Sequence, residues 1–209
     1  MCSKLMTFVV DPANPIYMSR NGIIMTKDGK TLVAIPGGAV VVSIPEGVEN
    51  IGDGAFAGYS SLTSITIPST VKSIGESAFS GCTSLASVTL PSSIRNIPDE
   101  AFASCKMLSS LDIPLTVTNI GNGAFVQCES LKSMTLPSSV VSIGSTAFGY
   151  CISLEHVDMP ADMLVTAMGS GVFIECRSLV EIALPNGITT IPNSTFRGCR
   201  NLVSVRIPS

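Results

Sequence analysis

Three kinds of residue recur at a fixed spacing along this 209-residue chain. Prolines stand at Pro45, Pro68, Pro91, Pro114, Pro137, Pro160, Pro185 and Pro208, phenylalanines at Phe56, Phe79, Phe102, Phe125, Phe148, Phe173 and Phe196, and leucines at Leu62, Leu85, Leu108, Leu131, Leu154, Leu179 and Leu202. Each step is 23 residues except one of 25, where two extra residues lie between Met163 and Met168 and are expected to form a bulge on a turn. A period of about 20 to 50 residues indicates stacked structural repeats.

The repeat unit runs in seven copies from Pro45 to Ile207 and reads P-x-x-V-x-x-I-G-x-x-A-F-x-x-C-x-S-L-x-x-V-x-L. Its last two apolar positions, such as Val88 and Leu90, have a period of two, which predicts a short strand with one buried face. The A-F-x-x-C segment has the spacing of about one helical turn. No copy can bury its apolar side chains alone, so stacked copies must cover one another. We therefore expect a solenoid with one parallel strand per turn, neighbouring strands lying about 4.8 Å apart.

This motif resembles the 23-residue leucine-rich repeat of the BspA-like surface proteins over all of residues 45–209. The resemblance implies a leucine-rich repeat solenoid. Such a solenoid is a right-handed coil with a parallel β-sheet on its concave face and short strands or helical turns on the other side.

The N-terminal residues fit the same family. Cys2, Leu5, Phe8 and Val10 occupy the C-x-x-L-x-x-V-x-L phase, so the chain opens halfway through a repeat. The next residues resemble an insertion that is common in this family. The matching residues are Asp11, Asn14, Pro15, Tyr17, Asn21, Gly22, Ile23, Ile24, Lys27, Asp28, Gly29, Leu32, Val33 and Pro36. Residues 23–26 and 31–35 flank an Asp-Gly turn and predict a β-hairpin, after which residues 40–44 are expected to rejoin the repeat.

These patterns predict one continuous domain, in which residues 1–44 are a half-repeat with a hairpin insertion and residues 45–209 are seven leucine-rich repeats. Repeat arrays normally carry polar capping units, and neither end of this chain has one. We expect either that the chain is a fragment of a longer array or that another molecule closes its ends.

Composition excludes several classes of protein. The chain is 45% apolar and only 13% charged, which is unlike a disordered tail. Its twelve Lys and Arg residues are scattered, which argues against a nucleic-acid partner. The longest charge-free window, residues 133–154, contains Pro137, Gly144 and Gly149 and is a poor membrane-spanning helix. The apolar run Leu5–Val10 is too short for a secretory signal.

Six cysteines share one phase of the repeat: Cys82, Cys105, Cys128, Cys151, Cys176 and Cys199. Zinc sites use ligand pairs two to four residues apart, which this spacing does not provide, and in-register Cβ atoms are too far apart for disulfides. The spacing therefore predicts a column of buried thiols that act as small apolar side chains. Cys2 shares the phase, and its place at the end of the chain leaves it open to exposure and reaction.

No catalytic constellation emerges, so we expect no enzymatic activity, cofactor or metal. Cys151 and His156 are five residues apart, but Cys151 belongs to the core column whereas His156 points outward from the predicted strand. The chain lacks a G-x-S-x-G elbow and a G-x-x-x-x-G-K phosphate loop. The sequon Asn193-Ser194-Thr195 places Thr195 at a buried position of the repeat and is interpreted as incidental.

The exposed face of the predicted sheet is the remaining candidate for function. Its first half is a ladder of Ser and Thr, such as Ser64 and Thr66, that ordinary solvated strands also carry. Its second half is charged, and the candidate partner-binding residues are Asp112, Lys132, Glu155, His156, Asp158, Glu181 and Arg206. The face lacks aromatic residues for stacking on sugars or bases.

Two functions remain open at this point. The first is a non-catalytic protein-binding module, for which the family resemblance implies a cell-surface or secreted location and adhesion to host or extracellular matrix proteins. The second is a structural spacer or an intracellular interaction scaffold, in which the repeats only set a distance.

Overall fold

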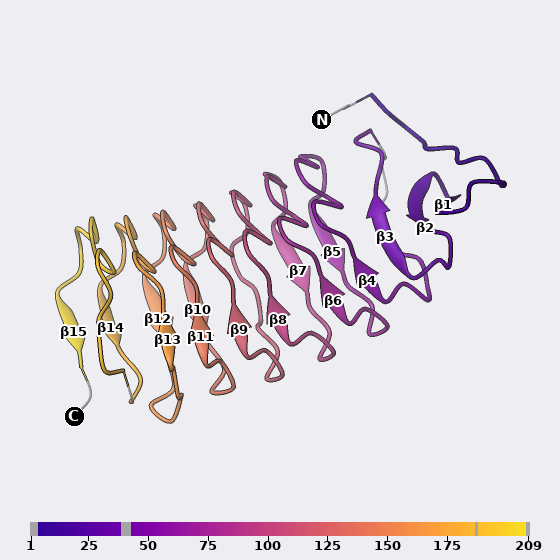
Figure 1. Cartoon of the computed structure of the whole chain (residues 1–209). Helices are drawn as coiled ribbons and strands as arrows, with labels where there is room; N and C mark the ends of the chain where they lie inside the picture. Colours follow the sequence, from indigo (N-terminus) through magenta and orange to yellow (C-terminus); the bar gives the residue numbers. More distant parts are fainter. Residues whose placement is uncertain (1–3, 39–42, 187, 208–209) are drawn as a thin grey trace.

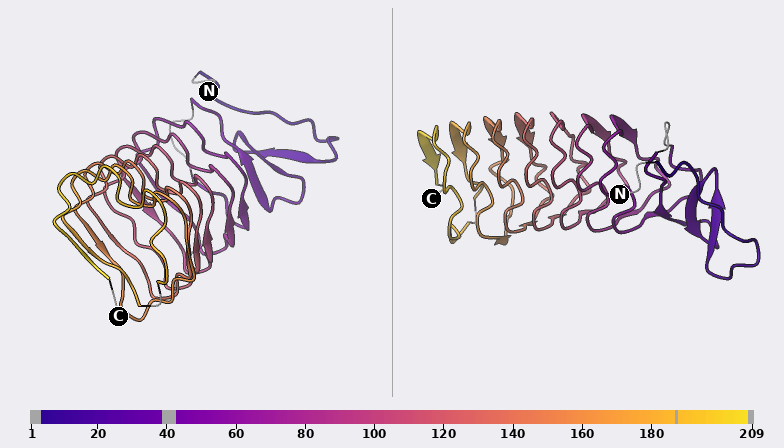
Figure 2. Two further views of the ribbon diagram at one scale, coloured as in Figure 1. Left: turned by 60° about the vertical axis from the view of Figure 1, so that its left-hand side comes forward. Right: turned by 90° about the horizontal axis from the view of Figure 1, so that it is seen from above.

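The protein is a β-solenoid of about seven turns. Its structure is a computed structural model that describes residues 4–38, 43–186 and 188–207. The coils stack beside one another in a single row, and the N-terminal hairpins lie at one end of that row (Figures 1 and 2). Cys2 and most of the segment expected to rejoin the repeat, residues 40–42, lie outside the described residues. The central prediction, a leucine-rich repeat solenoid with parallel strands, is confirmed.

One side of the solenoid is formed by strands of three residues, here called the three-residue strand row. Its members are β5 (Ser64–Thr66), β7 (Ser87–Thr89), β10 (Ser133–Thr135), β12 (His156–Asp158), β14 (Glu181–Ala183) and β15 (Ser204–Arg206). β5 pairs with β7, and β10, β12, β14 and β15 form a second parallel sheet in that order. In β5, as in most of the row, the middle residue is buried and the two outer residues are exposed, because successive side chains alternate between faces.

Residues 110–112, in the third coil, do not form a strand, so the expectation of one strand per turn is wrong there. Leu111 and Ile113 of this coil are nevertheless buried like their equivalents. Asp158 occupies the position equivalent to Asp112 and lies in β12, so residue type alone does not explain the break.

The opposite side carries strands of only two residues, here called the two-residue strand row. Its members are β4 (Asn50–Ile51), β6 (Ser73–Ile74), β8 (Asn96–Ile97), β9 (Asn119–Ile120), β11 (Ser142–Ile143) and β13 (Ala167–Met168). β4 pairs with β6, and β8, β9, β11 and β13 form a separate sheet. In the coils where a glycine follows the two-residue strand, its N–H donates to the preceding coil, as from Gly121 to the Ile97 carbonyl at 2.8 Å. Pro98 has no N–H to donate to β6, which explains the break between β6 and β8.

The A-F-x-x-C segments are turns, and among the described residues none is a helix, so the expectation of a helical turn is wrong. Each of these turns holds residues in the left-handed region, such as Glu100 at φ 54° and Ser104 at φ 57°, which a right-handed helix does not allow. The N–H groups of Glu100, Phe102 and Ser104 instead donate to carbonyls of the next coil at 2.7–2.8 Å. These turns therefore bind one coil to the next as the strands do.

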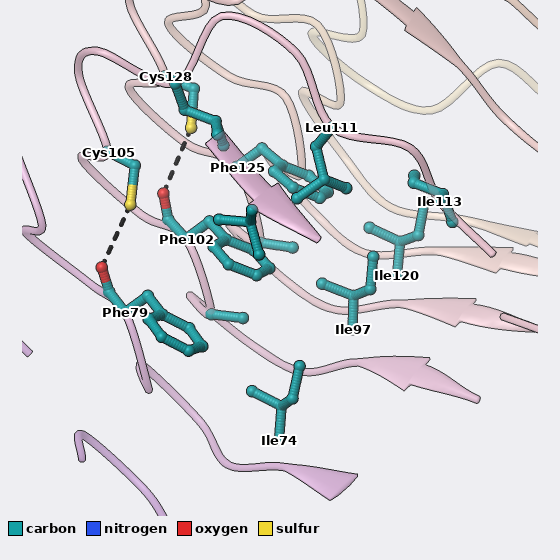
Figure 3. Close-up of a cluster of buried hydrophobic side chains, with 14 of the residues drawn as sticks. Ile74, Phe79, Ile97, Phe102, Cys105, Leu111, Ile113, Ile120, Phe125 and Cys128 are labelled. Carbon is teal, nitrogen blue, oxygen red and sulfur yellow. Dashed lines mark hydrogen bonds between the residues drawn. The ribbon is translucent and has the colours of Figure 1, made fainter. Parts of the chain in front are cut away.

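The core consists of columns of equivalent side chains (Figure 3). The seven phenylalanines of the repeat form a stack with ring centroids 4.8–6.0 Å apart and interplanar angles of 4–21°. Isoleucines of the two-residue strand row, such as Ile97 and Ile120, pack beside this stack. This arrangement confirms that the Phe, Leu and Ile positions of the repeat point inward.

The 25-residue copy places its insertion where the sequence indicated. The N–H of Met163 donates to the Pro160 carbonyl, as the equivalent N–H does in the preceding coils. The next hydrogen bond to the preceding coil is donated by the N–H of Thr166 to the Val141 carbonyl. Leu164 and Val165 are therefore the extra residues. Leu164 is exposed and Val165 is buried, and β13 resumes the regular pairing with β11.

Near the N-terminus, β2 (Ile23–Thr26) and β3 (Thr31–Ala34) form the predicted hairpin. β3 also pairs in parallel with β4, so the hairpin belongs to the same sheet as the first coils. A further strand, β1 (Tyr17–Arg20), pairs antiparallel with β2 across Asn21 and Gly22 and was not predicted. Both turn residues have positive φ, and Asn-Gly at such a position is a strong hairpin signal that could have revealed β1.

Candidate partner-binding surface

The candidate residues occupy the exposed side of the three-residue strand row and the segments that lead into it. His156, Asp158, Glu181 and Arg206 are the outer residues of β12, β14 and β15, which is why they point away from the core. Lys132 and Glu155 precede β10 and β12 and are also exposed, and the N–H of Glu155 donates to the Lys132 carbonyl at 2.8 Å. The strands therefore bring these six residues onto one face.

Asp112 lies apart from them, in the coil that has no strand. Its side chain is exposed, and with Ser110, Leu115 and Thr135 it lines a hollow of about 240 Å³. The structure thus places Asp112 on the same side of the solenoid but beside a different depression.

The registers of the sheet fix which side chains are neighbours. His156 is opposite Ser133 on one side and Glu181 on the other, and Glu181 is in turn opposite Ser204. Asp158 is opposite Thr135, and Ala183 is opposite Arg206. Neighbouring strands of a sheet are about 4.8 Å apart, so His156 and Glu181 can contact a common group.

A hollow of about 430 Å³ lies over these strands and is lined by His156, Val157, Asp158, Glu181, Ile182, Ala183, Ser204 and Arg206. A second hollow of about 380 Å³ adjoins it and shares Ala183 and Arg206, and apolar side chains such as Met159, Leu184 and Ile207 line its remaining wall. Among the described residues, none of the seven candidates forms an ion pair.

The cysteine column is buried, as predicted. Cys82, Cys105, Cys128, Cys151 and Cys176 have no exposed surface, and Cys199 is partly exposed. Every thiol of the column donates a hydrogen bond to the carbonyl of a phenylalanine in the preceding coil at 3.1–3.3 Å, as Cys105 does to Phe79 (Figure 3). Burial raises the pKa of Cys82 to about 12 and that of Cys199 to about 11. It also raises the pKa values of the other four thiols.

Burial and the raised pKa values keep these thiols protonated at neutral pH, which makes them poor nucleophiles because the thiolate is the reactive form. Cys151 in particular donates to the Phe125 carbonyl inside the core, whereas His156 is exposed, so the two do not form a catalytic pair. Across the described ranges, no group of three or more His, Cys, Asp or Glu residues could hold a metal ion. Thr195 of the sequon is buried, and its hydroxyl donates to the Pro192 carbonyl at 2.7 Å.

Sequence reasoning missed the polar ladders along the two-residue strand row. Asn119 donates to the Asn96 side chain and accepts from Ser142, both at 2.7 Å, and Asp99 accepts from the backbone and side chain of Asn122. Nearer the N-terminus, Glu49 lies between Lys30 and Lys72, whose hydrogen bonds lower its pKa. The 23-residue spacing of the bonded residues in the regular coils could have indicated these ladders. The ladders were missed because these outward positions carry no constant residue type.

The fold and this surface define a leucine-rich repeat solenoid with an exposed, charged sheet face. A family model described as the BspA type leucine-rich repeat region, in six copies, matches residues 40–155 and 95–209. The chain therefore belongs to the BspA-type leucine-rich repeat family. No match was found among curated proteins. In the described part of the chain, no helix is long and apolar enough to cross a membrane.

Several solved structures are similar to the chain. A leucine-rich cell surface protein of Faecalibacterium prausnitzii A2-165 is 33% identical with a TM-score of 0.69, and the match covers 75% of this chain and 42% of that protein. A leucine-rich repeat protein of T. pallidum is 28% identical with a TM-score of 0.57, and the match covers 81% of this chain and 90% of that one. The pneumococcal vaccine antigen PcpA, at 20% identity and a TM-score of 0.63, shares the fold. This chain thus spans less than half the length of the F. prausnitzii protein.

Proposed function

We propose that this protein is a non-catalytic protein-binding module that binds its partner through the charged part of the three-residue strand row. The observation that carries the proposal is the gathering of six exposed candidates, five of them charged side chains and the sixth His156, on one ordered face where folding does not require them. The outer strand positions of the first two coils carry only Ser and Thr, namely Ser64, Thr66, Ser87 and Thr89. Leucine-rich repeat proteins typically serve in protein interactions.

We further propose that the module acts at the cell surface or in secreted form and adheres to a host or extracellular matrix protein. Support comes from the 33% identical F. prausnitzii protein, which is described as a cell surface protein. The partner surface would be mixed in charge, because the patch combines acidic Glu155, Asp158 and Glu181 with basic Lys132 and Arg206.

The test is binding of the protein to a panel of immobilised extracellular matrix and host surface proteins. Asp158→Lys and Glu181→Lys are expected to weaken any specific binding at least about tenfold, since each reverses a charge inside the contact. Glu46→Lys makes the same change at an exposed position away from the patch and serves as the matched control. Unchanged binding by both patch variants would exclude this face as the binding site.

The alternative is a structural spacer or an intracellular scaffold. The feature that favours a spacer is the continuous set of bonds between coils, which makes a rod of defined length. If the protein binds nothing on the panel, and replacing one internal 23-residue repeat by another preserves its activity in the cell, the spacer is favoured.

A further inference from the structure

Ala183 stands out among the exposed positions that end the strands of the three-residue strand row. Its equivalents are Thr66, Thr89, Thr135, Asp158 and Arg206. Ala183 has the shortest side chain of this series and is exposed. It lies between Asp158 on β12 and Arg206 on β15, because β14 separates those two strands. A short side chain here leaves the 430 Å³ hollow open between an acid and a base.

The two charges do not pair with each other in the described structure. Two strand spacings separate Asp158 from Arg206, which amounts to about 9.6 Å between their backbones. His156 stands beside Asp158 on β12, and Ser204 stands beside Arg206 on β15. Glu181 lies on β14 between His156 and Ser204.

The chemistry of the walls defines the occupant. Asp158 and Glu181 accept hydrogen bonds from a cation, whereas Arg206 donates to a carboxylate in a fork geometry. A ligand with only a positive charge would meet Arg206, and a ligand with only a negative charge would meet two carboxylates. A dipolar ligand satisfies both ends.

We propose, building on the protein-binding function above, that this hollow receives a dipolar pair of side chains from the partner protein. The pair is a Lys or Arg and an acidic residue two positions apart on an extended segment. Side chains two positions apart on a strand lie on one face about 6.6 Å apart. The base then lies between Asp158 and Glu181, and the acid reaches Arg206 and Ser204.

The chain supplies its own reporter for a test, because His156 is its single histidine and lines the hollow. The probe is the blocked peptide acetyl-Lys-Gly-Glu-amide, titrated into the whole protein while the ring proton resonances of His156 are followed by NMR. We expect a saturable shift. Acetyl-norleucine-Gly-Glu-amide and acetyl-Lys-Gly-Gln-amide each lack one charge and are expected to bind at least about threefold more weakly, as for the loss of one exposed ion pair.

The decisive variant is Ala183→Thr, which adds a hydroxyl and a methyl group between Asp158 and Arg206, narrows the hollow at that point and leaves every charge in place. Thr occupies the equivalent position in β5, β7 and β10, so this variant is expected to fold normally. It should lose the saturable shift, whereas Thr66→Ala, a change in the same series far from the hollow, should not. Arg206→Gln should make the Glu and Gln peptides bind equally.

The proposal is overturned if Ala183→Thr binds the dipolar peptide as the parent does, or if the singly charged peptides bind equally well. Absence of any His156 shift overturns it too. The proposed function is judged separately. If no peptide binds but Asp158→Lys still abolishes binding of a whole partner protein, only this inference fails. If Asp158→Lys and Glu181→Lys leave the binding of every partner intact, the proposed function fails, whatever the peptides do.

Discussion

At the scale of the residue, each core position depends on the equivalent position in the coils before and after it. Phe125 has no exposed surface, and its ring lies between those of Phe102 and Phe148 at 5.6 and 5.3 Å. The Phe125 carbonyl also accepts from the N–H of Cys128 and the thiol of Cys151. One residue thus contributes to packing and hydrogen bonding in three coils.

Phe125→Ala is expected to lower the free energy of unfolding by about 3–5 kcal/mol, because neighbouring coils cannot collapse into the cavity left behind. Chemical denaturation followed by circular dichroism measures the change. Val141→Ala, at a more exposed apolar position, is the control and should cost much less. A loss below about 1 kcal/mol for Phe125→Ala would contradict a core role for the phenylalanine stack.

The buried thiols predict how stability depends on pH. Their pKa values are raised in the folded protein, so folding favours the protonated thiol. Unfolded thiols ionise near pH 9, so stability is fully present below that pH and falls as pH rises toward the folded values of about 11 for Cys199 and about 12 for Cys82. The urea midpoint should therefore drop between pH 8 and pH 10.5.

The matched variant for this effect is Cys82→Ala, which removes one ionisable thiol from the column. It should show a smaller drop in the urea midpoint over the same pH range, even if it is less stable at pH 7. An identical drop in the parent and the variant would mean that groups other than this thiol cause the alkaline loss of stability.

At the scale of the element, very short strands are stable because polar side chains join the coils beside the backbone ladder. β9 has two residues, and its Asn119 bonds to Asn96 of β8 and Ser142 of β11. The strands of this row are too short to be stable alone, so such bonds between coils hold them in register.

Asn119→Ala is expected to lower stability by about 1–2 kcal/mol, since it leaves two side-chain partners without their bond. Thermal and urea unfolding give the value. Asn201→Ala is a suitable control, because Asn201 is exposed and its side chain forms no hydrogen bond within the described residues. If the two substitutions lower the free energy of unfolding equally, the hydrogen bonds of Asn119 between coils contribute no stability.

In the molecule as a whole, the N-terminal hairpins share one sheet with β4 and β6 of the first two coils. β3 pairs with β4, and Met25 and Leu32 of the hairpin are fully buried. If residues 1–44 and residues 45–209 form one continuous domain, as predicted, removing the first part should destabilise the second.

Deletion of residues 1–44 is expected to lower the melting temperature, because it exposes the edge of β4 and the apolar end of the first coil. Differential scanning calorimetry of the whole chain and of residues 45–209 tests this expectation. An unchanged melting temperature would show that the hairpin unit does not stabilise the coils.

The repeat, the inward positions and the solenoid could all be predicted from the sequence, because each of them follows from a local pattern copied seven times. Phe125 and Cys128 could be placed in the core from their phase alone. Five of the seven candidate residues were likewise found by reading which predicted strand positions point outward, and Lys132 and Glu155 were added as charged neighbours of these positions. Nothing in the sequence says what binds there, because a partner acts on these residues only after folding.

Two features could not be predicted from the repeat pattern: which coils join through ladder bonds, and how the turns between strands are held. Pro98 interrupts one row because the missing N–H faces a carbonyl 24 residues away, and Glu100 adopts a left-handed conformation because its N–H is bonded to the next coil. The hollow over Ala183 likewise depends on Asp158 and Arg206, which belong to the preceding and following coils. These features arise from contacts between neighbouring coils, which a pattern within one repeat cannot express.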